Sequence, residues 1–335
     1  MPPFPRHNSS YGALLSVRTT RTSKSNFYPI LLSQAIGSYE GTLLTLSTSL
    51  HPVPSDADYE QLRLFKRLKT LEVSGAHETA LAEFKDALKE MDSLEALSVR
   101  LHSDKVEPTE FVSCFLSFSH LKSLGLKFSS NKQIQRPAPL PSAAGLTQLT
   151  KLTLSVPGPV NDLLASLPQL RHLESTVWHW SLDASVVWLP SLETLCVRPH
   201  TERTNDHGHR FSFSTESLSG LMQLRTLKLG VVDVSEGVGT ALASLPELTK
   251  LIFRDWSGTT SASRRAFFSS IGTMRSLEEL GLSFSEELEI SCDIFPQHFP
   301  TLKKLALAVS KEQAWLVRRK LAAVPQLQVG TNLSF

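Results

Sequence analysis

Residues 94–101 are Leu-Glu-Ala-Leu-Ser-Val-Arg-Leu, and residues 121–128 are Leu-Lys-Ser-Leu-Gly-Leu-Lys-Phe. Both stretches place an apolar residue at positions one, four, six and eight, counted from the first leucine. Ten copies of positions one, four and six follow one another, one of them without the apolar residue at position six, and seven of the ten also have an apolar residue at position eight. Their first leucines are Leu68, Leu94, Leu121, Leu149, Leu170, Leu192, Leu224, Leu248, Leu277 and Leu302. Nine steps separate the first copy from the last, so the average spacing is 26 residues. The whole fold is therefore predicted to be built from repeats.

Each copy has the alternation of a short strand, because alternate side chains of an extended chain point to opposite faces of a sheet. Positions four and six are expected to face inward. Between the copies lie segments with helical spacing, at 78–91, 109–119, 162–167, 261–274 and 311–324. Two further copies are expected, one upstream around Leu44 and Leu46 and a worn one near Leu327 and Val329.

One strand and one helix per repeat bury their apolar sides only by stacking on their neighbours. The predicted fold class is accordingly α/β: a solenoid or horseshoe of about 11–12 irregular repeats. It would have a parallel sheet on its concave face and helices on its convex face.

These residues resemble a leucine-rich repeat protein over about residues 40 to 329. The repeats are most similar to the degenerate repeats of fungal F-box proteins. They share three features with them: irregular spacing, the sequence Ser-Leu-Pro before Leu170 and Leu248, and the absence of Asn or Cys at position nine. In that family the repeats receive a substrate and the F-box recruits a ubiquitin ligase. The resemblance implies a substrate receptor or adaptor, although residues 1 to 40 show no F-box. The polar ladder that usually occupies position nine is expected to be missing.

Composition narrows the class of protein. The chain has 335 residues, a formal net charge of +2 and 41% hydrophobic residues, which is enough for a large core. The three cysteines, Cys114, Cys196 and Cys292, are far apart and form no metal-ligand pair or disulfide framework. No apolar run approaches the roughly 20 residues that cross a bilayer, so we expect a soluble protein with no membrane partner. Phosphate-loop, serine-hydrolase and zinc-protease motifs are absent from the sequence, and we predict no enzyme activity and no cofactor.

Positions three, five and seven of each copy are expected to line the concave face. Across the ten copies these positions hold three acidic residues, Glu72, Glu174 and Glu279, against eight basic ones. We predict that the basic residues form a ligand-binding face: Arg100, Lys127, Lys151, Arg198, Lys228, Lys250, Arg254 and Lys304. A wall of one charge attracts an opposite charge, and the expected partner is an acidic or phosphorylated protein segment, recognised by the middle and later repeats. The alternative is a solvated face whose cations prevent sheet association.

A histidine-containing insertion, the tryptophans and the overall distribution of basic residues do not by themselves indicate a metal, partner or nucleic-acid site, respectively. The insertion 199–215 contains His200, His207 and His209, but no further ligand completes a metal site, so a surface loop is predicted and no metal. Tryptophans follow two of the strands, and core packing is favoured over partner binding for them: Trp178, Trp180, Trp188 and Trp256. Nucleic acid is not favoured as a partner, because the charge forms no runs and no recognition motif is present.

The amino terminus differs from the rest of the chain. Residues 1–39 contain four basic residues and no acidic one: Arg6, Arg18, Arg21 and Lys24. We predict a disordered basic leader at 1–27 and a leucine-rich repeat domain at 28–335. A mitochondrial transit peptide is the alternative for the leader, and a cytoplasmic or nuclear location is expected otherwise.

The sequence thus predicts a non-catalytic protein–protein interaction module that resembles an adaptor or substrate receptor. Two alternatives stay open. One is a stand-alone scaffold with no ubiquitin-ligase link, and the other is a regulator of an enzyme such as a GTPase.

Overall fold

A computed structural model of the chain describes residues 13–16, 43–49, 62–63, 65–76, 78, 81–130, 137–177, 189–199, 211–212, 218, 220–230, 232–233, 237–253, 261–283, 299, 301–309, 311–320 and 327–330. The chain divides into two compact units. Unit 1 spans Met1–Gln133 and unit 2 spans Ile134–Phe335. Both are built from the same element, a strand followed by a turn or helix that returns the chain to the start of the next strand.

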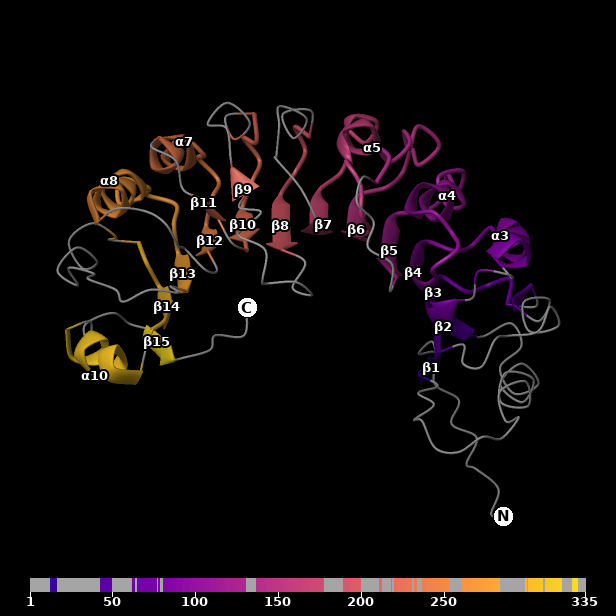
Figure 1. Ribbon diagram of the computed structural model, residues 1–335, viewed down its shortest axis with the longest axis horizontal. Coiled ribbons are helices and arrows are strands. Elements are labelled where there is room, and N and C mark those ends of the chain that lie inside the picture. The colour runs from indigo at the N-terminus through magenta and orange to yellow at the C-terminus, as the bar shows by residue number, and fades with distance from the viewer. Residues whose placement is uncertain are drawn as a thin grey trace, which may run out of the picture. The chain divides into compact units, whose positions relative to one another are not determined.

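Unit 1 contains five parallel strands among its described residues, side by side in chain order (Figure 1). They are β1 (Ala13–Ser16), β2 (Leu43–Ser49), β3 (Thr70–Ala76), β4 (Ala96–His102) and β5 (Ser123–Ser129). Parallel neighbours need a crossover connection, which the segments between the strands supply.

The strand register of unit 1 follows the repeat in the sequence. Leu97 on β4 pairs with Leu71 on β3 and with Leu124 on β5, and all three stand at position four. Leu46 on β2 pairs with Leu71, which confirms the expected upstream copy. Leu15 on β1 pairs in turn with Leu46. β1 is therefore one more copy, which the sequence analysis did not predict.

β1 lies inside 1–27, the segment for which we predict a disordered leader. Its four residues form a strand, and this differs from the prediction for them. The rest of 1–27 lies outside the described residues, so the leader and its boundary with a repeat domain at residue 28 stay predictions.

Two helices among the described residues of unit 1 pack on the side of the sheet that carries positions four and six. They are α3 (Leu81–Lys89) and α4 (Pro108–Ser113). α3 buries a stripe of apolar side chains spaced by three or four residues, Leu81, Phe84, Ala87 and Leu88, as an amphipathic helix does. α4 begins with a proline, which is suited to the first turn because the missing amide hydrogen has no partner there in any helix.

Aromatic rings fill the space between these helices and the sheet. The Phe115 ring centroid lies 5.4 Å from that of Phe111 and 6.3 Å from that of Phe84, in edge-to-face contacts. Phe111 also contacts Phe128 at the end of β5, at 6.0 Å. Edge-to-face packing is a favoured aromatic geometry, so these rings connect successive repeats.

Unit 2 contains eight parallel strands in chain order among its described residues. They are β6 (Lys151–Ser155), β7 (His172–Val177), β8 (Thr194–Pro199), β10 (Thr226–Leu229), β12 (Lys250–Phe253), β13 (Glu279–Ser283), β14 (Lys304–Ala308) and β15 (Leu327–Gly330). Two short strands, β9 (Phe211–Ser212) and β11 (Val232–Asp233), pair separately. Leu327 pairs with Leu305 and Val329 with Leu307, which confirms the worn last copy.

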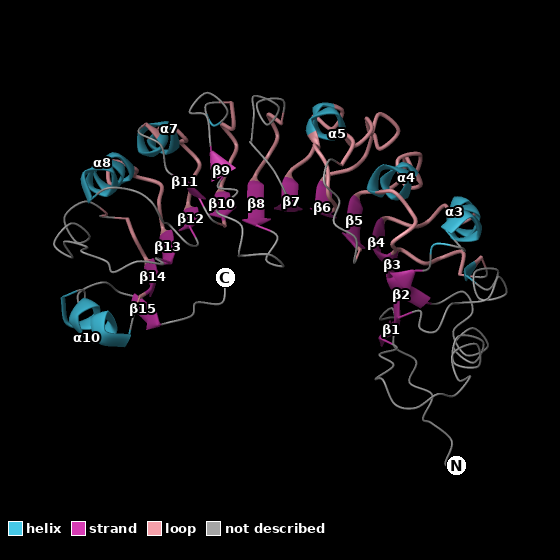
Figure 2. Ribbon diagram, viewed as in Figure 1, coloured by secondary structure: helices cyan, strands magenta, loops and turns pink. Residues whose placement is uncertain are grey.

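The helices among the described residues of unit 2 are α5 (Asn161–Ala165), α7 (Val238–Ala243), α8 (Ser261–Ile271) and α10 (Lys311–Lys320). In each unit the helices lie on one side of the strands (Figure 2). All five helical segments predicted from the sequence contain a helix at about the expected place, and α7 is additional. Gly239 in α7 explains the close approach of α8, because a Cβ atom there would lie 3.1 Å from the Phe267 backbone.

Between β3 and β14, the described turns that lead into the strands of the repeats place a buried apolar residue at intervals of three. The Leu167 amide donates to the Leu164 carbonyl and the Leu170 amide to the Leu167 carbonyl, both at 3.0 Å. All three leucines are buried. Parallel strands in register, leucines buried at positions one, four and six, and helices on one side together show the α/β leucine-rich repeat fold that the sequence predicts.

Candidate partner-binding face

The strand face is the side of the sheet that carries positions three, five and seven of each repeat, away from the helices. On β6, for example, Leu152 and Leu154 are buried, while Lys151, Thr153 and Ser155 are exposed or half-buried. The strand face therefore consists of the positions that the sequence analysis selected. Seven of the eight predicted basic residues lie on it, and Arg254 lies outside the described residues.

In unit 1 the strand face carries Arg100 at the end of β4 and Lys127 on β5. Their Cα positions are register partners, so the two cations are neighbours at position seven of adjacent repeats. Neither side chain has a hydrogen bond or an ion pair among the described residues. Like charges directly opposite each other on neighbouring strands are unfavourable, so the two cations repel each other across β4 and β5.

Small side chains surround the two cations. Gly125 pairs with Ser98 at position five, and a Cβ atom on Gly125 would lie 3.1 Å from Ser98 Oγ. Because Gly125 has no side chain, the Ser98 side chain can lie against the β5 backbone. On β4 and β5, no bulky side chain projects from the strand face at position five, beside Arg100 and Lys127. Glycine inside a strand often marks such a close approach.

In unit 2 most of the predicted cations are already paired on the strand face. Arg198 Nη2 lies 3.1 Å from Glu174 Oε1. Lys250 Nζ and Lys304 Nζ lie 2.7 and 3.1 Å from the two carboxylate oxygens of Glu279. Burial raises the pKa of Glu279, but hydrogen bonds and charges from the two lysines outweigh it, and the net pKa is lowered.

Lys151 on β6 and Lys228 on β10 are the remaining cations of the unit 2 strand face, and neither has an ion pair among the described residues. They stand at different positions, three and five, and on strands that are not neighbours. The structure therefore brings together Arg100 with Lys127 and separates Lys151 from Lys228. In the described part of the chain, no other register pair joins two cations.

A second row of charges runs along the edge where the strands begin, at position two of the repeats. Glu95 lies between two lysines, with its carboxylate oxygens 3.4 Å from Lys69 Nζ and 2.9 Å from Lys122 Nζ. Hydrogen bonds and charges from Lys122 and Lys69 lower the pKa of Glu95. In unit 2 the same position pairs Arg171 with Glu193 at 3.5 Å and Lys303 with Glu278 at 2.6 Å.

The sequence analysis missed this row. Its signal was the alternation of sign at position two, and it was overlooked because only positions three, five and seven were inspected for charge. These ion pairs join adjacent repeats at four steps, so Lys69, Lys122, Arg171 and Lys303 are already paired within the fold.

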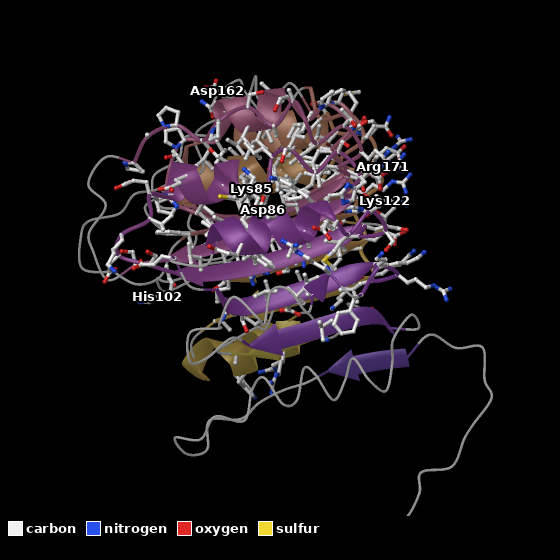
Figure 3. The ribbon with its side chains drawn as sticks, turned by 90° about the vertical axis from the view of Figure 1, so that its right-hand side faces the viewer. Lys85, Asp86, His102, Lys122, Asp162 and Arg171 are labelled. Carbon is white, nitrogen blue, oxygen red and sulfur yellow. The ribbon has the colours of Figure 1, made fainter. Side chains whose placement is uncertain are left out.

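At the opposite edge of unit 1, position nine carries one polar contact between adjacent repeats, although the usual Asn or Cys is absent there as expected. His102 Nδ1 lies 3.1 Å from Ser129 Oγ, and both residues stand at position nine of adjacent repeats. Ser130 Oγ donates to Asp104 at 2.7 Å one residue further on. Figure 3 shows His102 and Lys122 at opposite edges of unit 1, with Lys85 and Asp86 on α3. Histidine and serine replace the usual asparagine at this step.

Buried Ser103 completes this edge. Its hydroxyl donates to Glu78, and it accepts the amides of Lys105 and Val106 at 3.0 Å each. Lys105 Nζ lies 2.7 Å from the same glutamate. These contacts hold the turn between β4 and α4, and they raise the pKa of Lys105 through the Glu78 hydrogen bond and charge.

Among the described residues, no group of three or more His, Cys, Asp or Glu side chains could hold a metal ion. His200, His207 and His209 lie outside those residues, and so do Trp178, Trp180, Trp188 and Trp256. Predictions about them stay predictions. Burial raises the pKa of the Cys114 thiol, which leaves it a poor nucleophile. No helix in the described part of the chain is long and apolar enough to span a membrane.

No protein-family model matches the sequence, and no curated protein matches it significantly. Among solved structures, the matches include an internalin from Listeria monocytogenes, 15% identical with a TM-score of 0.48, where the match covers 90% of this chain and 89% of that one. A leucine-rich repeat protein from Leptospira interrogans is 17% identical with a TM-score of 0.38, where the match covers 89% of this chain and 86% of that one.

Proposed function

We propose that the chain is a non-catalytic protein–protein interaction module whose strand face binds an acidic segment of a partner protein. The observation that carries this proposal is the register pair of Arg100 and Lys127, two adjacent cations without an ion pair among the described residues. A partner carboxylate or phosphate between them would remove their mutual repulsion and accept charge-assisted hydrogen bonds.

This proposal moves the centre of the site. The sequence analysis expected the middle and later repeats to recognise the acidic partner. Glu174 and Glu279 occupy Arg198, Lys250 and Lys304 there, so a partner would have to displace an existing ion pair. Among the described residues of unit 1, neither Arg100 nor Lys127 has an ion pair that a partner would have to displace, and the acidic residue of the strand face there is Glu72, diagonal to Arg100.

The test is a binding titration of the full chain with a labelled peptide rich in aspartate and glutamate, followed by fluorescence anisotropy. In the double variant Arg100→Ser, Lys127→Ser we expect affinity to fall by about tenfold or more, since a charge-assisted contact contributes at least the 1.4 kcal/mol that equals a factor of ten. The matched control is Lys66→Ser, Arg67→Ser, which removes the same charge from two exposed residues outside the strand face.

Equal losses in the two double variants would show only an effect of net charge and would overturn the proposal. No binding by the unmodified chain would overturn it as well. Thermal unfolding of each variant checks that it is folded, because all four side chains are exposed or half-buried and their removal should leave the core intact.

The adaptor role is the finer proposal, supported by the resemblance of the repeats to those of fungal F-box proteins. It predicts a ubiquitin-ligase subunit in affinity capture of the full chain, retained by the Arg100→Ser, Lys127→Ser variant. Absence of any ligase subunit would favour the stand-alone scaffold. A change in GTP turnover on adding the purified chain to a captured GTPase would favour the regulator instead.

A further inference from the structure

The geometry points to a second protein-docking surface on α10, formed by Trp315, Arg318 and Arg319 and distinct from the strand face. Its partner would be a protein that presents an apolar pocket rimmed by carboxylates. The basis is one exposed aromatic ring and two guanidinium groups on a single side of a helix.

Trp315 is exposed in a way that tryptophan seldom is. Its residue is 64% exposed, and Met222 at 49% is the other large apolar residue with high exposure among the described residues. Tryptophan has a large apolar surface to bury, and on α10 that surface lies under the guanidinium group of Arg319, a pairing of residue types that protein interfaces favour.

The helix holds Trp315 outward by its own periodicity. α10 contacts β15, and Val317 is buried with 4% exposure. Because successive residues of a helix are about 100° apart, Val317 lies roughly opposite Trp315, whereas positions 318 and 319 lie within about 60° of it. Burial of Val317 therefore directs Trp315 and both arginines to the same outer side.

Arg319 and Trp315 form a pre-arranged pair. The guanidinium carbon of Arg319 lies 5.5 Å from the centre of the Trp315 ring. A cation stacked on the ring restricts its rotamers before a partner arrives, which lowers the entropy lost on binding. Arg318 is also exposed. It already has an interaction within the chain, so Arg319 carries the positive charge that a partner would meet beside the ring.

These residue types and charges identify the kind of partner. Tryptophan and arginine are enriched in the energetically dominant parts of protein interfaces. The sequence of α10 has four basic residues and one acidic residue, so the complementary surface is acidic. A lipid surface is less favoured, because one tryptophan on a ten-residue helix offers little area for insertion.

The experiment is a selection of random displayed peptides on the full chain, with counter-selection on the Trp315→Ala variant. We expect peptides that combine acidic residues with an apolar anchor and that lose about thirtyfold or more in affinity for Trp315→Ala, the range of an interface hot spot. Arg319→Gln should weaken the same peptides and reduce the salt dependence of their binding. Arg319→Lys should weaken them less, since it keeps the charge.

Matched controls are Met222→Ala, which truncates the other exposed apolar side chain, and Arg275→Gln, which removes an exposed cation elsewhere in unit 2. Neither should change the affinity. The strand-face variant Arg100→Ser, Lys127→Ser should also bind these peptides normally, so this surface and the proposed function can fail separately.

Three outcomes would overturn the inference. The selection could yield no peptide that depends on Trp315, or Trp315-dependent peptides without acidic residues. Trp315-dependent binding to vesicles of anionic phospholipid without any such peptide would identify a lipid surface instead. Self-association abolished by Trp315→Ala would identify a second copy of the chain.

Discussion

Arg198 Nη2 on β8 lies 3.1 Å from Glu174 Oε1 on β7, so a cation that the sequence assigns to partner binding is paired within the sheet itself. The two residues stand at different positions of adjacent repeats, seven and five, and meet diagonally across the strand face. This contact decides how much of the predicted basic face is available to a partner.

The first prediction concerns this ion pair. Glu174→Gln should release Arg198 and raise the affinity for an acidic peptide by a few fold, whereas Arg198→Ser should weaken binding less than Arg100→Ser does, because Arg198 is already occupied. Anisotropy titrations with the peptide used for the strand face measure both effects. Equal weakening by Arg198→Ser and Arg100→Ser would contradict the assignment of unit 1 as the centre.

The pH dependence of stability should reveal the position of Glu279. Its folded-state pKa lies below its ordinary value of 4.5, so its contribution is complete above that value and disappears as the pH falls through the folded-state pKa. The difference in unfolding free energy between the unmodified chain and Glu279→Gln, measured in urea, should therefore be largest near neutral pH and vanish in acid. A pH-independent difference would contradict the paired state.

The aromatic contacts of unit 1 should dominate its stability. Phe115 is fully buried between Phe84 and Phe111, and Phe115→Ala should lower the unfolding free energy by about 3–5 kcal/mol. Trp315→Ala, a truncation of an exposed ring, should lower it by less than about 1 kcal/mol. Denaturant unfolding of the two variants compares them directly, and similar losses would contradict the described burial.

The row of charges at position two should make stability depend on salt. Glu95→Lys would place three lysines beside one another, and the midpoint of thermal unfolding should fall. The fall should be large at low ionic strength and nearly absent at about 1 M salt, where the Debye length is about 3 Å. A fall of the same size at both salt concentrations would indicate a cause other than charge.

Gly158 should be intolerant of any side chain. Its φ is +131°, and a Cβ atom there would lie 2.8 Å from the Ala138 carbonyl oxygen. Gly158→Ala should lower the unfolding free energy by about 1–3 kcal/mol. Gly237, with a φ of +99°, is the other described glycine of positive φ, and Gly237→Ala measures the cost of that backbone conformation at a second position.

Much of the fold was predictable because the leucines show where each repeat begins and which of its residues face the core. Leu71, Leu97 and Leu124 stand at position four in the sequence and are register partners in the sheet, since a shift by one residue would turn the whole apolar set outward. The strand β1 was not predictable in this way, because 12–17 has only its alternating apolar residues and no leucine at position one.

The candidate site was predictable only as a list of positions. Sequence periodicity by itself determined the repeats, their phase and the residues of the strand face, because alternation along a strand is a local property of the chain. The tertiary structure alone decided which cations are free, because Glu174 and Glu279 reach Arg198, Lys250 and Lys304 across neighbouring strands from about 24 to 29 residues away in the sequence. It likewise left Arg100 beside Lys127 and turned Trp315 outward, since charge pairing and burial depend on distances between side chains that no local pattern contains.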